Sequence, residues 1–134
     1  MDRVFVDSSA FVGIFNADDS LHGAAHAKSQ TLSDLRARSA TSYAVIDESA
    51  TVLSQRASKE RACKFLDWAL KENGPELLAI NEYLWHEAYG LFRSVTNKNI
   101  SMVDCQIVAL CREHAIKTIF TFDKHFAKLG LTVL

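Results

Sequence analysis

Short apolar runs alternate with longer amphipathic segments from one end of the chain to the other. The runs predict strands at residues 3–6, 40–42, 77–80, 117–122 and 131–134, where β-branched and aromatic side chains gather. The amphipathic segments predict helices at residues 10–16, 21–38, 43–56, 59–71, 82–95, 101–114 and 123–129. Because the strands are apolar throughout, we expect helices on both faces of a mostly parallel sheet, in a three-layer α/β/α sandwich.

Capping residues support several of these boundaries. Ser58 is a good N-cap for the helix that follows it. Ser101 and Asp104, three residues apart, form a variant of the capping box in which Asp replaces Glu or Gln. Residues 73–75 (Asn-Gly-Pro) predict a stop, and Gly130 predicts a helix C-cap.

Length and composition narrow the class of protein. The 134 residues suit a single domain, which we expect to span residues 1–134. The net charge of −1 provides no overall basic field for nucleic acid. Cys63, Cys105 and Cys111 have no paired spacing, so we expect reduced core thiols. The chain shows neither a secretory leader nor an apolar run of roughly 18–20 residues, so we expect a soluble cytoplasmic protein with no membrane contact.

Four acidic residues are expected at one edge of the predicted sheet. Asp7 follows the first strand and Asp123 follows the fourth, and right-handed crossovers bring the carboxyl ends of parallel strands to the same edge. Glu48 and Asp104 lie near the starts of helices that can begin there. Singly, the three aspartates suit helix N-termini and Glu48 suits a solvated surface. Their joint placement favours a common site.

Several carboxylates in one partly apolar place repel one another and tend to take up protons. A divalent cation removes both difficulties, and oxygen ligands suit Mg²⁺ or Mn²⁺, which also bind substrate phosphate. Such a cation lowers the pKa of a bound water, and a second one stabilises a leaving oxygen. The four acids are therefore our candidate metal-binding and catalytic residues, with the number of metals left open.

Four stretches of the chain, in this order, resemble PIN domains, and among them the VapC-like ribonuclease toxins of type II toxin–antitoxin pairs. The stretches are residues 4–11, residues 41–49, residues 101–104 and residues 119–126. The resemblance implies a Rossmann-like sandwich with a five-stranded parallel sheet, a Mg²⁺ or Mn²⁺ site, and hydrolysis of RNA phosphodiester bonds. It also implies an RNA substrate, a small antitoxin partner and a homodimer.

The resemblance assigns the acidic positions of the family to Asp7, Glu48, Asp104 and Asp123, with Ser9 and Thr121 as accessory polar positions. Asp47 is a neighbour that competes with Glu48 for the assignment. A helix turns by about 100° per residue, and Glu48 shares its face with Val45 and Val52, so we prefer Glu48.

Two functional hypotheses follow. The first is a metal-dependent endoribonuclease that acts as the toxin of a toxin–antitoxin pair. The alternative is a catalytically weak PIN-fold module that serves as a nucleic-acid or protein interaction domain. The presence of all four acids favours the first hypothesis.

The remaining histidines, aromatic residues and basic residues belong to no motif, so their expected roles rest on general preferences. We expect His125 to be exposed, and His22 and His26 to have a surface or packing role. Most aromatic residues suit the core, but four are dense enough on one helix to predict a dimer face: Tyr83, Trp85, Tyr89 and Phe92. Four basic side chains either contact the RNA backbone or are simply exposed to solvent, and the sequence does not distinguish the two: Arg3, Lys98, Lys124 and Lys128.

Overall fold

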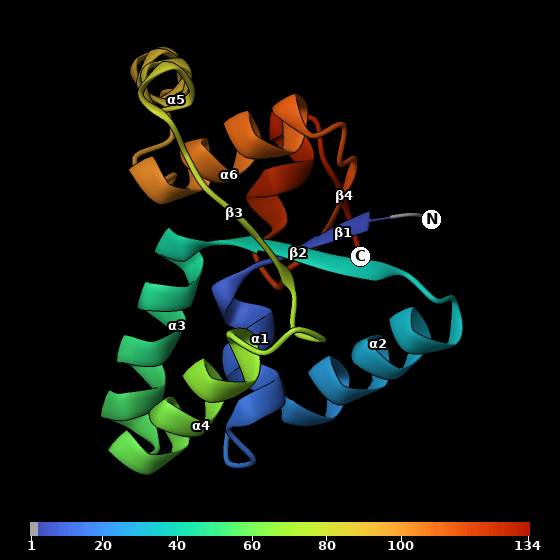
Figure 1. The fold of residues 1–134 in the computed structure, drawn as a ribbon. Coiled ribbons are helices and arrows are strands. Elements are labelled where there is room, and N and C mark those ends of the chain that lie inside the picture. The colour runs from blue at the N-terminus through green and yellow to red at the C-terminus, as the bar shows by residue number, and fades with distance from the viewer. Residues whose placement is uncertain (1–2) are drawn as a thin grey trace.

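The computed structural model describes residues 3–134 and contains a five-stranded sheet, as predicted (Figure 1). The strands are β1 (Arg3–Val6), β2 (Arg38–Ser42), β3 (Glu76–Leu78), β4 (Thr118–Phe120) and β5 (Thr132–Val133). Their order is β3-β2-β1-β4-β5, and every pairing is parallel. The chain thus moves outward from β1 through β2 to β3 and then returns to β4 on the other side of β1. Open parallel sheets bind ligands at such a reversal, beyond the carboxyl ends of the strands.

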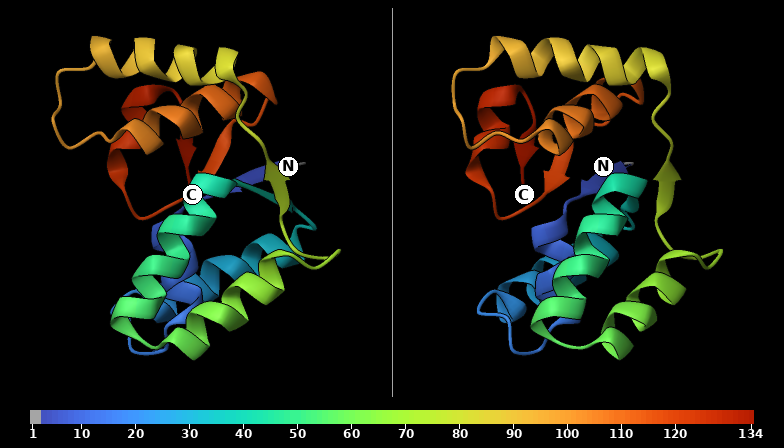
Figure 2. Two further views of the ribbon diagram at one scale, coloured as in Figure 1. Left: turned by 60° about the vertical axis from the view of Figure 1, so that its left-hand side comes forward. Right: turned by 90° about the vertical axis from the view of Figure 1, so that its left-hand side faces the viewer.

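Helices cover both faces of the sheet, which confirms the three-layer prediction (Figures 1 and 2). One layer contains α1 (Ser8–Phe15), α2 (His22–Asp34), α3 (Tyr43–Arg56) and α4 (Lys59–Ala69). The other contains α5 (Glu82–Ser94), α6 (Met102–Glu113) and the 3₁₀-helix η1 (Lys124–Leu129). Side-chain caps on Ser42, Ser58, Asn81 and Ser101 fix where α3, α4, α5 and α6 begin.

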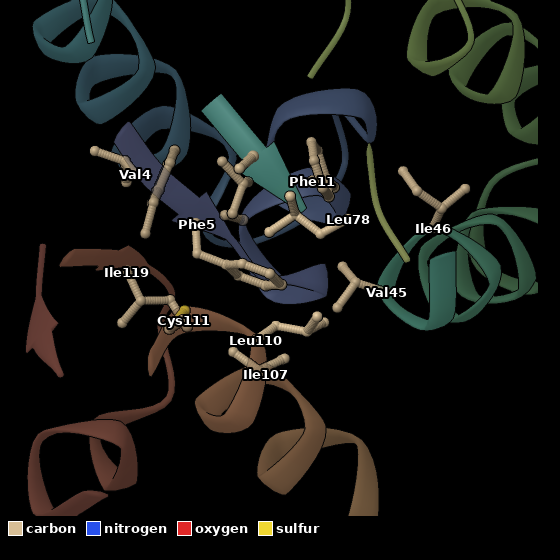
Figure 3. Close-up of a cluster of buried hydrophobic side chains, with 14 of the residues drawn as sticks. Val4, Phe5, Phe11, Val45, Ile46, Leu78, Ile107, Leu110, Cys111 and Ile119 are labelled. Atoms are coloured by element: carbon tan, nitrogen blue, oxygen red, sulfur yellow. The ribbon is translucent and has the colours of Figure 1, made fainter. Parts of the chain in front are cut away.

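The main core lies where the central strand meets both helical layers. Phe5 of β1 is fully buried, and Figure 3 shows its ring close to Val45 of α3 and to Ile107 and Leu110 of α6. Burying one such side chain contributes about 1.5–3 kcal/mol. Asp7, which directly follows β1, is therefore attached to the best-packed part of the molecule.

Two of the differences between predicted and observed helix boundaries have clear local causes. The first helix begins at Ser8 rather than at residue 10, because the Asp7 carboxylate accepts a hydrogen bond from the Ser8 N–H and caps the helix at once. The second helix ends at Asp34 rather than at residue 38, because Arg36 has a φ of 55° and turns the chain toward β2. Gly130, with a φ of 94°, ends η1 as predicted.

The strand predicted at residues 117–122 is shorter in the structure, since β4 covers only residues Thr118–Phe120. Beyond Phe120, the Thr121 hydroxyl donates a hydrogen bond to the Asp7 carboxylate and accepts one from the Asp123 N–H. The prediction of three core thiols is wrong for Cys63, which is exposed, whereas Cys105 and Cys111 are buried. Within residues 3–134, no helix has the length and apolar character that a membrane crossing requires.

Candidate active site at the carboxyl edge of the sheet

Asp7 is the most deeply buried of the four acids, with 3% of its surface exposed. Its N–H donates to the Phe120 carbonyl over 3.0 Å and so extends the β1–β4 pairing by one residue. Its Oδ1 accepts from the Ser8 N–H over 2.7 Å, and its Oδ2 accepts from the Thr121 hydroxyl, also over 2.7 Å. The carboxylate is therefore held in one orientation by groups from two loops.

Ser9 and Thr121 join these two loops. Their hydroxyl oxygens lie 3.3 Å apart. The Ser9 hydroxyl accepts from the Phe122 N–H over 3.0 Å, and the Thr121 hydroxyl accepts from the Asp123 N–H over 3.0 Å. Both residues, predicted as accessory positions, thus contact the loop that carries Asp7 or Asp123.

Asp104 occupies the predicted capping box at the start of α6. The Ser101 hydroxyl accepts from the Asp104 N–H over 3.0 Å, while Asp104 Oδ2 accepts from the Ser101 N–H over 2.9 Å. Only 14% of the Asp104 side chain is exposed. Its structural role as a cap and its place beside the other acids are compatible, since the cap uses only Oδ2.

Glu48 and Asp47 are distinguished by their surroundings. Glu48 Oε1 accepts from the Ser8 hydroxyl over 3.2 Å, so α3 is tied to the turn that carries Asp7. The Asp47 side chain has no hydrogen bond or ion pair with residues 3–134, and it is exposed. Glu48 is itself exposed, more than its apolar helix face predicts.

Burial raises the pKa of Asp7 to about 6, and the charges of Asp123 and Asp104 add to the rise, against the hydrogen bonds from Thr121 and Ser8. Burial also raises the pKa of Glu48, again with Asp104 and Asp123 adding to the rise, while the Ser8 hydrogen bond opposes it. The charges of Asp104 and Asp123 thus lie close enough to disfavour ionisation of Asp7 and of Glu48. Within residues 3–134, none of the four carboxylates forms an ion pair with Lys or Arg.

The chemistry of these groups fits a hard divalent cation, although the side chains are not closed around one. As they stand, no group of three or more His, Cys, Asp and Glu side chains within residues 3–134 could hold a metal ion. Mg²⁺ commonly uses only one or two carboxylates and takes its other ligands from water and substrate phosphate. Asp123, which is exposed and makes no capping hydrogen bond with its side chain, keeps both carboxylate oxygens free for this purpose.

His125 is the residue that the sequence did not reveal. The expectation of an exposed imidazole is wrong: 19% of the side chain is exposed, and Nε2 lies 3.0 Å from Asp104 Oδ2. The ring packs against Phe126, which is fully buried, with the two ring centres 4.7 Å apart. Phe126, the next residue in the chain, has a large apolar side chain that favours the core, and it was the one signal in the sequence that could have indicated the burial of His125.

Arg3 does not contribute positive charge near the acids. It lies at the opposite, amino end of β1, where it pairs with Glu76 at 3.1 Å and donates to the His114 carbonyl over 2.6 Å. Lys98, Lys124 and Lys128 are exposed. The solvated and RNA-binding interpretations thus remain open for these three lysines and not for Arg3.

An open groove of about 230 Å³ extends from the acidic edge along α3. Ser8 and Glu48 line one part of it, and Val52, Asp19 and Arg56 line another. Glu48, Val52 and Arg56 are spaced by four residues, so they share one helix face, and the outer two are separated by about 12 Å along the axis. A larger apolar cavity of about 490 Å³ lies between α1, α2 and α4 and contains none of the four acids.

The fold and this edge define a class of α/β proteins with carboxylates gathered where a parallel sheet reverses its order. The chain belongs to the PIN domain family, whose model matches residues 4–131. The comparison with curated proteins gave no match.

Two solved structures have the same fold. VapC20 from Mycobacterium tuberculosis, described as a toxin that cleaves the sarcin–ricin loop, is similar with a TM-score of 0.85 at 24% identity, over 96% of each chain. VapBC2 from Rickettsia felis, solved bound to a DNA fragment from its promoter, is similar with a TM-score of 0.72 at 18% identity, over 98% of this chain and 97% of that one. The family resemblance read from the sequence is thereby confirmed.

Proposed function

We propose that this protein is a metal-dependent endoribonuclease that acts in the cytoplasm as the toxin of a toxin–antitoxin pair. The observation that carries the proposal is the gathering of four carboxylates, without a Lys or Arg partner among residues 3–134, where the parallel sheet reverses. Membership of the PIN family and the fold shared with VapC20, described as a toxin that cleaves the sarcin–ricin loop, support the same function.

Asp7, Asp104 and Asp123 would hold Mg²⁺ or Mn²⁺, with Glu48 bound directly or through water. When bound, the cation supplies an activated water and neutralises charge on the phosphate. Asp7 is the central residue in this proposal, because Ser8 and Thr121 fix its carboxylate before any ligand arrives. Such preorganisation removes a reorganisation cost from the reaction itself.

Glu48 is the residue that we assign to proton transfer. Hydrolysis joins a water oxygen to phosphorus and breaks the bond to one ester oxygen, so a base near the attacking water has to accept a proton. The raised pKa of Glu48 makes its carboxylate a better acceptor than an ordinary exposed glutamate. The Ser8 hydroxyl, 3.2 Å from Glu48 Oε1, orients this base.

The groove along α3 is the proposed path of the RNA strand. It is continuous with Ser8 and Glu48 at one end, and Arg56 supplies a cation about 12 Å further along the helix. Arg56 forms no ion pair within residues 3–134 and is exposed. A guanidinium in this place can bind a backbone phosphate next to the cleaved one and hold the strand in register.

Cleavage of a labelled structured RNA by the purified chain tests the proposal directly. We expect cleavage with Mg²⁺ or Mn²⁺, none with EDTA, and recovery when the cation is added back. A DNA of the same sequence, run in parallel, measures the preference for RNA. Binding of the RNA without cleavage under any of these cations would instead support the catalytically weak interaction module.

The antitoxin is proposed from the VapBC2 relative, and the neighbouring reading frame tests it. We expect a small adjacent gene that encodes a DNA-binding protein. Co-expression of that product should inhibit RNA cleavage and co-purify with this chain. An adjacent product that neither binds nor inhibits would contradict the toxin role but not the nuclease activity.

A homodimer through α5 completes the proposal. Tyr83, Trp85, Tyr89 and Phe92 are 67%, 41%, 42% and 42% exposed, which is unusual for large aromatic side chains. The rings of Trp85 and Tyr89 stack at an interplanar angle of 10° with centres 6.0 Å apart. Trp85, Tyr89 and Phe92, spaced by four and three residues, share one side of α5 that is suited to burial against a second copy, whereas Tyr83 lies on another side of the helix.

A further inference from the structure

Among the Lys, Arg and His side chains of residues 3–134, His125 alone has a nitrogen within 4 Å of a carboxylate oxygen of the four acids. It comes from η1, and its partner Asp104 comes from the first turn of α6. The contact therefore links the two elements that carry Asp123 and Asp104. None of the roles assigned above uses His125.

The surroundings of His125 Nε2 are unusual for a ring nitrogen. The atom is buried and has no hydrogen bond within residues 3–134. It lies 3.0 Å from Asp104 Oδ2, but the ring is not oriented so that an N–H on Nε2 would point at that oxygen. Buried polar atoms in folded proteins are nearly always satisfied. A small rotation of the imidazole about its side-chain bonds would complete a hydrogen bond from Nε2 to Asp104 Oδ2.

We propose that His125 is a positioning residue that holds the Asp104 carboxylate for cation binding, an inference that rests on the proposed function. Asp104 Oδ2 is approached by the Ser101 N–H at 2.9 Å and by His125 Nε2 at 3.0 Å. Its Oδ1 has no hydrogen bond within residues 3–134. A hydrogen bond from His125 beside the one from Ser101 would stop the carboxylate from rotating and leave the other oxygen available to the cation.

Outer hydrogen-bond partners of this kind orient metal-binding side chains, and their loss typically lowers metal affinity by about 10–100-fold. A packing role is the alternative, because the His125 ring also lies against Phe126. The two roles are separable by chemistry. Phenylalanine at position 125 keeps an aromatic ring for packing and has no N–H, whereas glutamine has an N–H donor and no ring.

The test compares His125→Phe, His125→Gln and the unaltered chain in Mn²⁺ affinity, measured by electron paramagnetic resonance of the free ion. Cleavage of RNA is measured on the same samples. We expect His125→Phe to weaken Mn²⁺ binding by about 10–100-fold and His125→Gln to restore most of it. His86→Phe is the matched control, because His86 is 61% exposed and lies near Glu82 and Trp85 rather than near the four acids, so this variant should bind Mn²⁺ as well as the unaltered chain does.

Thermal melting checks that the variants are folded, and His125→Leu, which also lacks a donor, serves the comparison if His125→Phe does not fold. If the unaltered chain binds Mn²⁺ and cleaves RNA while the variant without a donor binds Mn²⁺ equally well, the positioning role is wrong and the nuclease proposal stands. Equal losses in His125→Phe and His125→Gln would also overturn it. An unaltered chain that neither binds Mn²⁺ nor cleaves RNA overturns both proposals.

Discussion

At the scale of single residues, Asp7 combines a structural and a chemical role. It caps α1, extends the β1–β4 pairing and lies in the most buried part of the acidic edge. Burial raises its pKa to about 6, well above the 3.8 of an ordinary aspartate. The charged form of Asp7 that cation binding requires is thus the form that burial in the fold disfavours.

This conflict predicts a stability that depends on pH. Between pH 3.8 and about 6, the folded chain keeps a proton on Asp7 that the unfolded chain releases, so the free energy of unfolding falls as pH rises through this window. The difference between the two pKa values corresponds to about 3 kcal/mol. Asp7→Asn, which cannot ionise, should be more stable than the unaltered chain at pH 7, and this advantage should shrink toward pH 4.

Urea denaturation of both proteins in EDTA, from pH 4 to 7.5, measures this difference. EDTA is needed because a bound cation would stabilise the charged carboxylate and hide the effect. A stability difference that stays constant across the range would show that the Asp7 carboxyl titrates normally in the folded chain.

The sequence allowed the positions of these residues to be predicted better than their contacts. Asp7 was identified because it follows a strand, and strand ends share an edge in a parallel sheet. The hydrogen bond from Thr121, 114 positions away, depends on how two loops meet and has no local signal. The burial of His125 was missed because Asp104, 21 positions earlier, approaches it only in the folded chain, and the neighbouring Phe126 was the one local signal.

At the scale of elements, helix starts were predicted well and strand lengths poorly. Capping side chains are local, so Ser42, Ser58 and Ser101 fixed the starts of α3, α4 and α6. The length of a strand depends on its neighbours: the backbone pairing of β4 with the chain after β1 runs to Phe120, and the next residue, Thr121, contacts Asp7 through its side chain.

Helix α3 carries both an acid and a cation on one face, which leads to a prediction about substrate binding. Arg56→Ala should raise the KM for RNA about tenfold with kcat nearly unchanged, since a hydrogen bond to a charged group contributes about 1.5 kcal/mol or more. Steady-state cleavage at several salt concentrations measures this effect. Arg61→Ala, on the exposed surface of α4 and outside the groove, is the matched control.

If Arg56→Ala and Arg61→Ala change KM equally, the arginine acts through net charge alone. A fall in kcat with unchanged KM would place Arg56 in the chemical step instead of in strand binding. Either result would contradict the proposed path of the RNA along α3.

At the scale of the whole molecule, the central strand β1 pairs with β2 from the first half of the chain and β4 from the second. This arrangement supports our proposal that residues 1–134 form one domain, and a single calorimetric unfolding transition is the expected result. The alternation of strands and helices was enough to predict the layers, whereas the strand order was not readable from local pattern.

The exposed aromatic residues of α5 belong to this scale as well. We predict that the chain sediments as a dimer and that Trp85→Glu converts it to a monomer, because a charge in a buried aromatic interface is unfavourable. Leu70→Glu is the control, since Leu70 is 67% exposed at the end of α4, which lies in the other helical layer from α5 (Figure 2). A monomeric profile of the unaltered chain at high concentration would contradict the dimer.

The central claim is that four carboxylates at the sheet edge form one catalytic site, and a single comparison of RNA cleavage tests it most directly. Asp7→Asn, Glu48→Gln, Asp104→Asn and Asp123→Asn each remove one charge with little change in shape, and Asp47→Asn is the exposed neighbour that serves as control. We predict losses of at least about 100-fold for Asp7→Asn and Asp104→Asn, since outer partners of metal ligands alone account for about 10–100-fold. Asp47→Asn should stay within about twofold, as expected for a surface change. Cleavage that survives both Asp7→Asn and Asp104→Asn would contradict the site.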